Sequence, residues 1–261
     1  MYDKTHAMPP KVSIITVVRN AAQALNSTLE ALVAMDYPNK EIILIDGLST
    51  DLTPEVIKRY AQHISYWVSE KDSGLYDAMN KGIQAATGDY LWFINAGDKP
   101  YSPHTLSLIF AAGEPLHDIY FGGALIVDAQ GAPLGLRRKA LPRELSWRSL
   151  QWGMVVCHQS FLVSRAIAPR YDLHYRYASD IDWVIRCLKA STSTHNTHLI
   201  LSQFAQGGLS SAHRAESWRE RYAIMRHHYG PARTTLLHLW FVLRAALERG
   251  RDYRALPKDQ L

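Results

Sequence analysis

The sequence has little cysteine and no long apolar run, and these two shortages exclude several classes of protein. Its two cysteines, Cys157 and Cys187, are too few for a disulfide framework and do not have the spacing of metal ligands. The apolar run at residues 236–243 is much shorter than the roughly 20 residues that cross a bilayer. The N-terminus also lacks the apolar stretch of a secretory signal. We therefore expect a cytoplasmic protein without a transmembrane helix.

Glycine is missing where many nucleotide-binding folds need it. Residues 11–18 are typical of a buried strand and residues 21–34 of a helix, but the turn between them, VVRNAAQ, contains no glycine. Dinucleotide-binding proteins use glycines there, because phosphate must approach the helix N-terminus. A P-loop and the glycine-rich N-terminal loop of nucleotidyltransferases are absent too. A bound diphosphate must therefore be held in another way.

A regular alternation of strands and helices fills the first part of the chain. Apolar, β-branched runs predict strands at 11–18, 41–46, 64–69 and 90–95. Apolar residues at helical spacing predict helices at 21–34, 53–63 and 75–87. This alternation predicts an α/β fold with a mostly parallel, Rossmann-like sheet flanked by helices. A chain of 261 residues with 47% hydrophobic content is large enough for one such domain.

The pattern is looser after residue 98. Two runs, 118–127 and 135–139, suggest a hairpin, and aromatic residues are frequent at 146–156. Further strands are expected at 158–164 and 199–204. Helices are expected at 181–190, 214–229 and 234–249.

Acidic residues follow three of the four predicted early strands. They are Asp46, Asp72 and Asp98. Ligands of open α/β sheets bind beyond the carboxyl ends of the strands, so these acids are candidate ligand contacts. Turns and helix caps also favour Asp, so each acid taken alone is weak evidence for a ligand site.

Two features of the predicted helix at 75–87 stand out. Asp77 and Lys81 are four residues apart and share one face, which either binds a ligand or faces solvent. Gly82 lies in the middle of the helix, where glycine costs about 1 kcal/mol relative to alanine. Close approach of another backbone would explain this glycine.

Two acids at a strand end can hold a divalent cation, which would neutralise a departing diphosphate. In the turn NAGD, Asn95 takes the place of the first acid and Asp98 is the remaining carboxylate. Taken alone, this segment is more typical of an ordinary turn than of a metal site.

Asp180 also has two interpretations, as a helix N-cap or as a general base, and its spacing in the sequence does not decide between them.

Taken in order, the blocks IITVVRN, LIDGLSTDLT, SEKDSGLYDAMNKGIQAATGDYLWFINAGD, CHQSFLVS, YASDIDWVIR and QGGLSS form one pattern. Over residues 11–211 the sequence resembles bacterial family 2 glycosyltransferases, in particular those like the colanic acid transferases. The resemblance implies a GT-A fold in residues 1–211, with a donor-binding half at about 11–100 and an acceptor half at about 101–211. Residues 212–261 would be a basic C-terminal helical extension.

The resemblance also implies a reaction. A sugar would move with inversion from a nucleotide diphosphate sugar to a hydroxyl of a glycan or lipid-linked oligosaccharide in polysaccharide biosynthesis, with Mg²⁺ or Mn²⁺ as cofactor. Asp180 would be the general base, and Asp98 would hold the metal and diphosphate. The alternative is a catalytically inactive relative that only binds nucleotide sugars.

The remaining roles are carried over from the same resemblance. The residues expected at the nucleotide are Thr16, Arg19, Asn20, Asp46, Asp72, Asp77, Lys81 and Asn95. The residues expected at the acceptor or the metal are His158, Gln159, Asp182 and His213. For His158, a satisfied core histidine is an equal alternative. Gly207, Gly208 and Ser210 are expected to shape a loop over the donor.

The C-terminal segment is basic. Residues 214–254 contain nine arginines and four acids, a surplus that equals the net charge of +5 for the whole chain. It suits a solvated helix face, an anionic membrane surface or nucleic acid, but acids at three strand ends would repel a nucleic-acid backbone. One helix face, which carries Leu236, Trp240, Leu243 and Leu247, either packs on the core or contacts the inner membrane leaflet.

Overall fold

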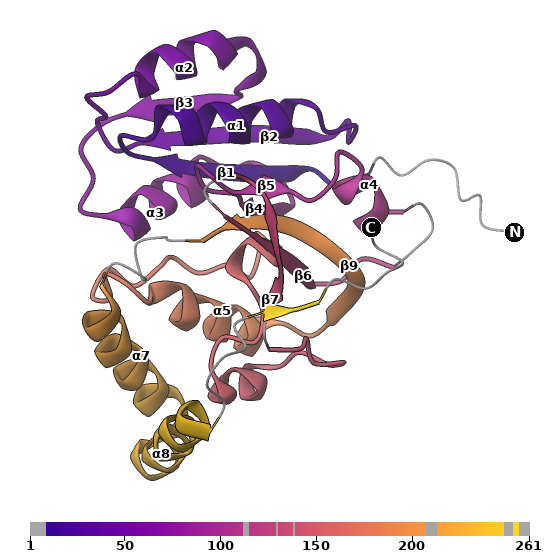
Figure 1. Cartoon of the computed structure of the whole chain (residues 1–261). Coiled ribbons are helices and arrows are strands. Elements are labelled where there is room, and N and C mark those ends of the chain that lie inside the picture. Colours follow the sequence, from indigo (N-terminus) through magenta and orange to yellow (C-terminus); the bar gives the residue numbers. More distant parts are fainter. Residues whose placement is uncertain are drawn as a thin grey trace, which may run out of the picture.

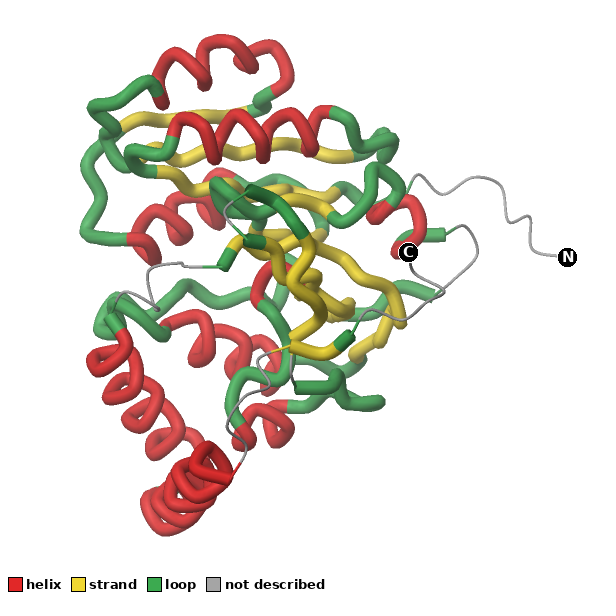
Figure 2. The backbone as a smooth tube through the Cα atoms, in the orientation of Figure 1, coloured by secondary structure: helices red, strands yellow, loops and turns green. Residues whose placement is uncertain are grey.

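The computed structural model describes residues 9–111, 115–128, 130–137, 139–206, 213–247 and 253–255. Their strands form one ten-stranded sheet, and helices cover it on both sides (Figures 1 and 2). The order along the main path of the sheet is β10-β7-β6-β8-β4-β1-β2-β3. The donor-binding and acceptor halves expected from the sequence thus share one sheet.

The first half is parallel, as predicted. Its strands are β1 (Val12–Val18), β2 (Lys40–Asp46), β3 (Tyr66–Ser69) and β4 (Tyr90–Phe93). Its helices are α1 (Ala22–Val33), α2 (Thr53–Tyr60) with a 3₁₀ turn at Ala61–His63, and α3 (Leu75–Ala85). Successive side chains of a strand face opposite sides, so Ile14 packs with α1 and α2 whereas Ile15 packs with α3.

The second half differs from the mostly parallel sheet that was predicted. Its strands are β5 (Lys99–Pro100), β6 (Ile119–Val127), β7 (Pro133–Arg137), β8 (Phe161–Ser164), β9 (Thr194–Ala205) and β10 (Tyr253–Arg254). Only β6 and β9 pair in parallel there, and the other pairs are antiparallel. The sheet as a whole is therefore mixed, with a parallel first half and a largely antiparallel second half.

The helices of the second half lie in the connections between its strands. They are α4 (Thr105–Ile109), 3₁₀ turns at Trp147–Trp152 and His158–Ser160, α5 (Ser179–Ala190), α7 (Arg214–Tyr229) and α8 (Pro231–Leu247). The strand expected at 158–164 therefore begins only at Phe161. Within the described part of the chain, no helix is both long enough and apolar enough to cross a bilayer.

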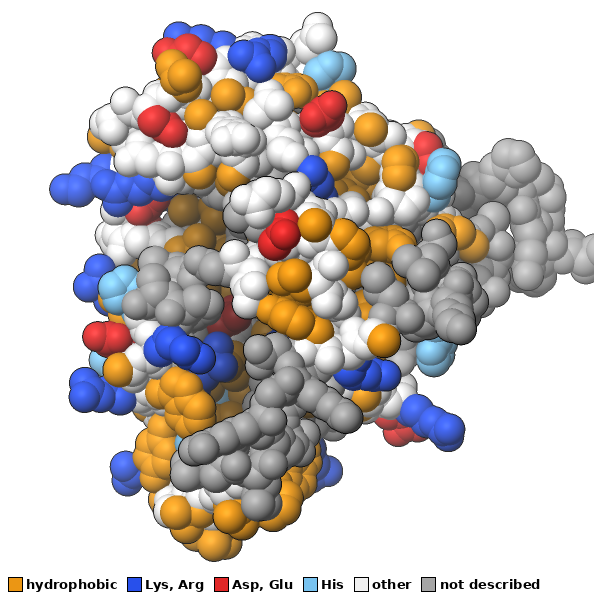
Figure 3. Space-filling view, in the orientation of Figure 1, with side chains coloured by type: hydrophobic (Ala, Val, Ile, Leu, Met, Phe, Trp, Pro, Cys, Tyr) orange, Lys and Arg blue, Asp and Glu red, His pale blue; other side chains and the backbone are white. Residues whose placement is uncertain are grey.

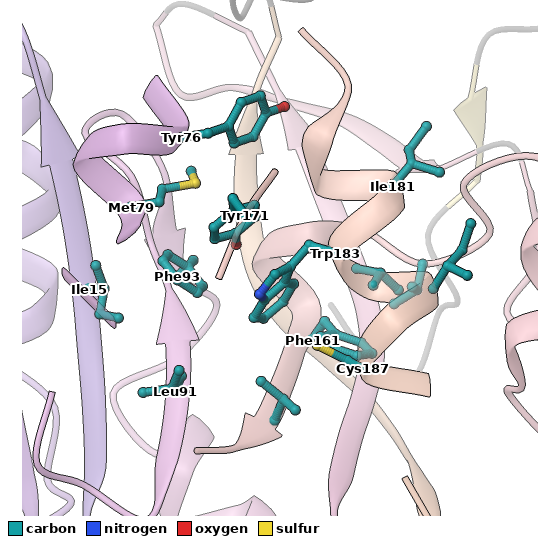
Figure 4. Packing of buried hydrophobic residues seen from close by; sticks show 14 of the residues in the cluster. Ile15, Tyr76, Met79, Leu91, Phe93, Phe161, Tyr171, Ile181, Trp183 and Cys187 are labelled. Carbon is teal, nitrogen blue, oxygen red and sulfur yellow. The ribbon is translucent and has the colours of Figure 1, made fainter. Parts of the chain in front are cut away.

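An aromatic cluster joins the two halves of the sheet (Figure 4). Trp183 of α5 is fully buried and stacks on Tyr171, with ring centroids 4.9 Å apart. The edge of Phe93, at the end of β4, meets Trp183 at 5.4 Å. The indole N–H of Trp183 donates to the carbonyl of Pro169 at 2.7 Å, so its one polar atom is satisfied. These contacts fix α5 against the end of β4.

The mid-helix glycine of α3 is explained by close packing. A Cβ at Gly82 would lie 2.4 Å from Cγ2 of Ile15 in β1, so no larger residue fits while Ile15 keeps its place. The expected close approach is present, but the neighbour is the Ile15 side chain and not a backbone. This packing sets the distance between α3 and the sheet.

Candidate active site

A cavity of about 620 Å³ lies at the carboxyl end of β1, between the two halves of the fold. We call it the strand-end cavity, and it is lined by Val17, Val18, Arg19, residues 72–78, Leu173, Arg176, Tyr177 and His213. Its position agrees with the rule that ligands bind beyond the strand ends. Four of the predicted site residues line it, namely Arg19, Asp72, Asp77 and His213.

The loop before α3 is shaped to form one wall of this cavity. Asp72 accepts a hydrogen bond from the backbone N–H of Gly74 at 3.0 Å, and Asp77 accepts one from Ser73 at 2.9 Å. A Cβ at Gly47 would lie 2.3 Å from Asp72 Oδ2, so glycine is needed there for Asp72 to keep this position. The first turn of α3 consequently borders the cavity.

Other predicted nucleotide residues lie behind the cavity wall. Asp46 is fully buried and accepts hydrogen bonds from the Ser49 and Ser69 hydroxyls. Thr16 is also fully buried and donates to the carbonyl of Ile94 at 2.8 Å. In the structure, both residues fix strand ends and loops.

Asn20 and Lys81 are tied to neighbouring loops as well. Asn20 has a φ of 49°, and its side-chain oxygen accepts a hydrogen bond from the backbone N–H of Thr50 at 2.8 Å. Lys81 forms an ion pair with Glu70 at 2.7 Å. Neither residue is among those that line the strand-end cavity.

The turn after β4 holds a buried carboxylate. Asp98 is 5% exposed and accepts hydrogen bonds from the Gln159 amide at 2.8 Å and the backbone N–H of Ala205 at 3.3 Å. Burial raises the pKa of Asp98 to about 7, although both hydrogen bonds favour the charged form. The buried side-chain oxygen of Asn95 has no hydrogen-bond partner among the described residues. The turn is beside β1, since the N–H of Ala96 donates to Val17.

These oxygens fit a divalent cation that is held mainly by a ligand. No cluster of three or more His, Cys, Asp or Glu able to hold a metal occurs within the described ranges. Asp98 keeps free lone pairs beside its two hydrogen bonds, and the side-chain oxygen of Asn95 is a second hard donor. Mg²⁺ is commonly bound by one or two protein oxygens together with substrate phosphates. The turn therefore suits a metal that enters with a diphosphate.

Asp180 is in the first turn of α5, beside the strand-end cavity. Its carboxylate accepts a hydrogen bond of 3.3 Å from the hydroxyl of Tyr76, a residue that lines the cavity. The backbone before α5 is held by Glu220 of α7, whose carboxylate accepts the N–H groups of Arg176, Tyr177 and Ala178 at 2.7–3.0 Å. The fold therefore carries Asp180 back to the strand ends, which sequence spacing alone did not show.

Asp182, two residues further on, is part of a buried ion-pair network. It accepts hydrogen bonds from Arg186 at 2.7 Å and from His228 of α7 at 2.8 Å. Burial alone would raise the pKa of Asp182, but His228 and Arg186 hold it below its usual value. Both of its oxygens are thus occupied by protein partners that join α5 to α7.

The pair His158-Gln159 is also internal. His158 is 6% exposed, and its Nε2 is 2.6 Å from the Tyr171 hydroxyl. Burial lowers the pKa of His158 to about 4, so the ring is neutral near pH 7. His158 matches the satisfied core histidine that was the alternative interpretation, while Gln159 positions Asp98. His213 differs from both, since its ring lies in the strand-end cavity and stacks on Tyr177 at 4.6 Å.

Four residues that matter for the site were not expected from the sequence, and the first is Tyr76, which lines the strand-end cavity and donates to Asp180. Arg176 and Tyr177 line the strand-end cavity, and Glu220 holds the backbone beside it. Tyr177 is the first residue of the block YASDIDW, and Arg176 directly precedes that block. This position was the only clue to either residue in the sequence. Nothing in the sequence connects Glu220 with that block. The expected donor loop at Gly207, Gly208 and Ser210 lies outside the described residues.

Comparison with known proteins identifies the family. The model of glycosyl transferase family 2 matches residues 13–169, and the chain belongs to this family. A PGL/p-HBAD biosynthesis glycosyltransferase from Mycobacterium bovis is 29% identical over 216 residues, covering 77% of this chain and 80% of that protein. An uncharacterized glycosyltransferase from Mycobacterium tuberculosis is 33% identical over 217 residues, covering 80% of this chain and 79% of that protein. The protein is thus a glycosyltransferase, as the sequence predicted.

Solved structures confirm the GT-A fold. Residues 1–349 of TarS from S. aureus, in complex with UDP-GlcNAc, match with a TM-score of 0.65 and 15% identity over 90% of this chain and 72% of that one. The mannosyltransferase PcManGT from Pyrobaculum calidifontis, in complex with GDP-Man and Mn²⁺, matches with a TM-score of 0.61 and 15% identity. The match covers 95% of this chain and 78% of that one. The division into residues 1–211 and an extension 212–261 stays a prediction.

Replacing Glu220 by alanine should loosen the segment that carries Asp180. Three backbone N–H groups would lose their acceptor, and we expect a loss of about 2 kcal/mol in the free energy of unfolding. Amide hydrogen exchange at residues 176–178 should become faster. The matched control is Glu216→Ala, one turn earlier on an exposed part of α7. Equal exchange in both variants would contradict the role given to Glu220.

Proposed function

We propose that this glycosyltransferase moves a sugar, with inversion, from a nucleotide diphosphate sugar to a hydroxyl of a glycan or lipid-linked oligosaccharide in polysaccharide biosynthesis. The observation that carries this proposal is the hydrogen bond between Tyr76 and Asp180. Through this hydrogen bond, the Asp180 carboxylate in the second half of the fold lies at the edge of a cavity that both halves line. The narrower resemblance to the colanic acid transferases stays a prediction.

The strand-end cavity is the proposed donor site. Arg19 supplies a positive charge, and the first turn of α3 supplies the positive end of a helix, which suits diphosphate where no glycine-rich loop exists. Asp72 and Asp77 are available to accept hydrogen bonds from nucleobase N–H groups or ribose hydroxyls. The other predicted nucleotide residues would then act indirectly, by holding the loops that form the cavity wall. They are Thr16, Asn20, Asp46 and Lys81. The complexes of TarS with UDP-GlcNAc and of PcManGT with GDP-Man support a nucleotide sugar as donor.

Asp98 and the Asn95 side-chain oxygen are the proposed ligands of Mg²⁺ or Mn²⁺, with His213 as a further candidate. When bound, the cation would neutralise negative charge on the leaving diphosphate. Gln159 orients Asp98, and binding of a cation would favour its charged form over the protonated form that burial favours. PcManGT contains Mn²⁺ together with GDP-Man, which supports this assignment.

Asp180 is the proposed general base. As the acceptor oxygen attacks the anomeric carbon, its proton passes to a carboxylate oxygen of Asp180. The bond between that carbon and the diphosphate oxygen breaks on the opposite face, so the configuration inverts. Tyr76 holds one carboxylate oxygen of Asp180 in place, and Glu220 fixes the backbone before it. In this proposal, His158 and Asp182 support the site through packing and helix contacts.

The variant Asp180→Asn keeps the shape of the side chain but removes the base. We expect transfer to fall by at least about 100-fold while nucleotide binding is unchanged, since general-base catalysis contributes this much or more. Transfer is measured with radiolabelled donor, and binding by calorimetry. Asp172→Asn, on the exposed loop before α5, is the matched control. Retained transfer in Asp180→Asn would reject Asp180 as the base, and donor binding without transfer in the wild type would favour the inactive relative.

The exposed face of α8 is the proposed contact with an anionic membrane. Four of its apolar side chains are exposed, at 68% for Leu236, 64% for Leu239, 49% for Trp240 and 52% for Leu243. They follow the spacing of one helix face, and Figure 3 shows apolar side chains gathered at the lower end of the molecule, where α8 lies. This exposure disfavours core packing for these residues. The side chains of Arg244 and Leu247, and residue Arg249, lie outside the described part.

We accordingly propose a cytoplasmic enzyme that binds peripherally to the inner face of the membrane. An apolar helix face combined with a basic segment binds anionic lipid through buried area and charge together. Arg233 provides one exposed cation at the start of α8.

The variant Leu239→Glu should release the protein from membranes. Cosedimentation with vesicles of phosphatidylcholine and phosphatidylglycerol should recover most of the wild type in the pellet and most of the variant in the supernatant. The reason is that a carboxylate would enter the apolar face that contacts the lipid. Leu108→Glu is the matched control, since Leu108 is 56% exposed on α4. Equal sedimentation of both variants, or no sedimentation of the wild type, would contradict membrane contact through α8.

A further inference from the structure

A second cavity, of about 530 Å³, lies between helices α7 and α8 and strands β6, β7 and β9. We call it the C-terminal cavity. Its lining residues are Ile126, Arg137, Lys139, Gly153, Met154, Ile181, Phe204, Gln206, Trp218, Arg221, Met225, His238, Phe241 and Tyr253. Among the described residues, none lines both this cavity and the strand-end cavity.

Large apolar side chains form most of its wall. Phe204 comes from the end of β9, Met154 from the connection before β8, and Trp218, Met225 and Phe241 from α7 and α8. A hollow of this size with aromatic and thioether walls favours an apolar ligand group, because burial of such surface is worth about 25 cal/mol per Å². Trp218 is 51% exposed, so the cavity reaches the surface between the two helices.

The charges of the C-terminal cavity are all of one sign. Arg137, Lys139 and Arg221 line it, and its described lining contains no Asp or Glu. The buried Nε of Arg221 has no hydrogen-bond partner among the described residues. A buried donor without an acceptor is costly, and a guanidinium is the side chain best suited to phosphate. These features favour an anionic ligand group beside the apolar one.

The C-terminal cavity reaches the proposed catalytic residues from the acceptor half. Ile181 follows Asp180 directly in α5, and Gln206 follows Ala205, whose backbone N–H donates to Asp98. The strand-end cavity approaches Asp180 through Tyr76. Both cavities therefore lie close to the first turn of α5.

Helix α8 connects this cavity with the proposed membrane surface. His238 and Phe241 face the cavity, whereas Leu236, Leu239 and Leu243 are exposed on the other side of the same helix. An apolar chain that leaves the cavity beside Trp218 would thus meet the part of the molecule that carries the exposed apolar face.

We propose that the C-terminal cavity binds the acceptor, and that the acceptor is an amphiphile with a phosphate group and a hydrocarbon chain. Arg221, with Arg137 and Lys139, would hold the phosphate, and the apolar wall would hold the first part of the chain. This inference rests on the proposed function, since it specifies the acceptor class of the same reaction.

Titration calorimetry on the full chain tests the inference with dodecyl phosphate below its micelle concentration. The comparison ligands are inorganic phosphate, which lacks the chain, and dodecyl maltoside, which lacks the charge. We expect dodecyl phosphate to bind at least about tenfold more tightly than either, since each half of the cavity contributes. Binding should persist in the presence of a nucleotide diphosphate, because the described linings of the two cavities have no residue in common.

Two variants and one control locate the site. Arg221→Gln should weaken dodecyl phosphate binding by about tenfold, the loss expected for one charge-assisted contact. Trp218→Ala removes a half-exposed wall residue, so we expect little effect on the core. It should weaken the binding of dodecyl phosphate and leave the binding of inorganic phosphate unchanged. Arg226→Gln changes an exposed arginine of the same helix and should have no effect. Thermal unfolding is measured for all three variants.

Several outcomes would overturn the inference. The first two are that dodecyl phosphate does not bind, or that dodecyl maltoside binds as tightly as dodecyl phosphate. The others are that Arg221→Gln and Arg226→Gln have the same affinity for dodecyl phosphate, or that a nucleotide diphosphate displaces dodecyl phosphate. Nucleotide sugar binding without dodecyl phosphate binding would reject this inference and leave the proposed function intact. Failure of every nucleotide diphosphate sugar to bind would instead reject the proposed function.

Discussion

The packing of Trp183 against Phe93 and Tyr171 is the contact on which the site depends. It is fully buried and joins a helix of the second half to the last strand of the first half. Close-packed interiors transmit small displacements, so any shift of this ring would move the first turn of α5. Glu220 adds a second constraint from α7 by holding three consecutive N–H groups just before that turn. The place of Asp180 follows from these two contacts.

Transfer between two substrates requires a base on one side of the reacting carbon and a leaving group on the other. In the proposed arrangement, the strand-end cavity holds the donor and the C-terminal cavity holds the acceptor, and both lie close to the first turn of α5. The strand-end cavity is lined by two acids, two arginines and a helix N-terminus, and the C-terminal cavity has apolar walls with three cations. The difference in lining explains how the protein would distinguish a nucleotide from an amphiphile.

The sequence predicted the first half of the fold well, because each strand and helix there has a clear local period and neighbours in sequence are neighbours in space. The second half was harder to predict. The pairing of β8 between β4 and β6 depends on long-range contacts that no local pattern encodes. The strand at 158–164 starts three residues late, since a 3₁₀ turn places Gln159 where it can hold Asp98.

The candidate site was predictable to a similar degree. The segments after the strands suggested Arg19, Asp72 and Asp77, which line the strand-end cavity, and Asp98, which lies in the turn after β4, because strand ends converge at one edge of the sheet. Spacing did not reveal that the Asp46 and Thr16 side chains face inward, since burial depends on the tertiary packing of residues such as Ser69 and Ile94. It could not connect Glu220 with residues 176–178 either, as they are about forty residues apart along the chain and meet only through folding.

The most direct test of the account is calorimetric binding of UDP, GDP and dTDP sugars to the wild type and to Asp98→Asn, each with and without Mn²⁺. The account predicts that at least one nucleotide sugar binds the wild type and that Mn²⁺ tightens this binding, by about tenfold if one charge-assisted contact is gained. In Asp98→Asn, Mn²⁺ should have little effect. If no nucleotide diphosphate sugar binds under either condition, the account is contradicted.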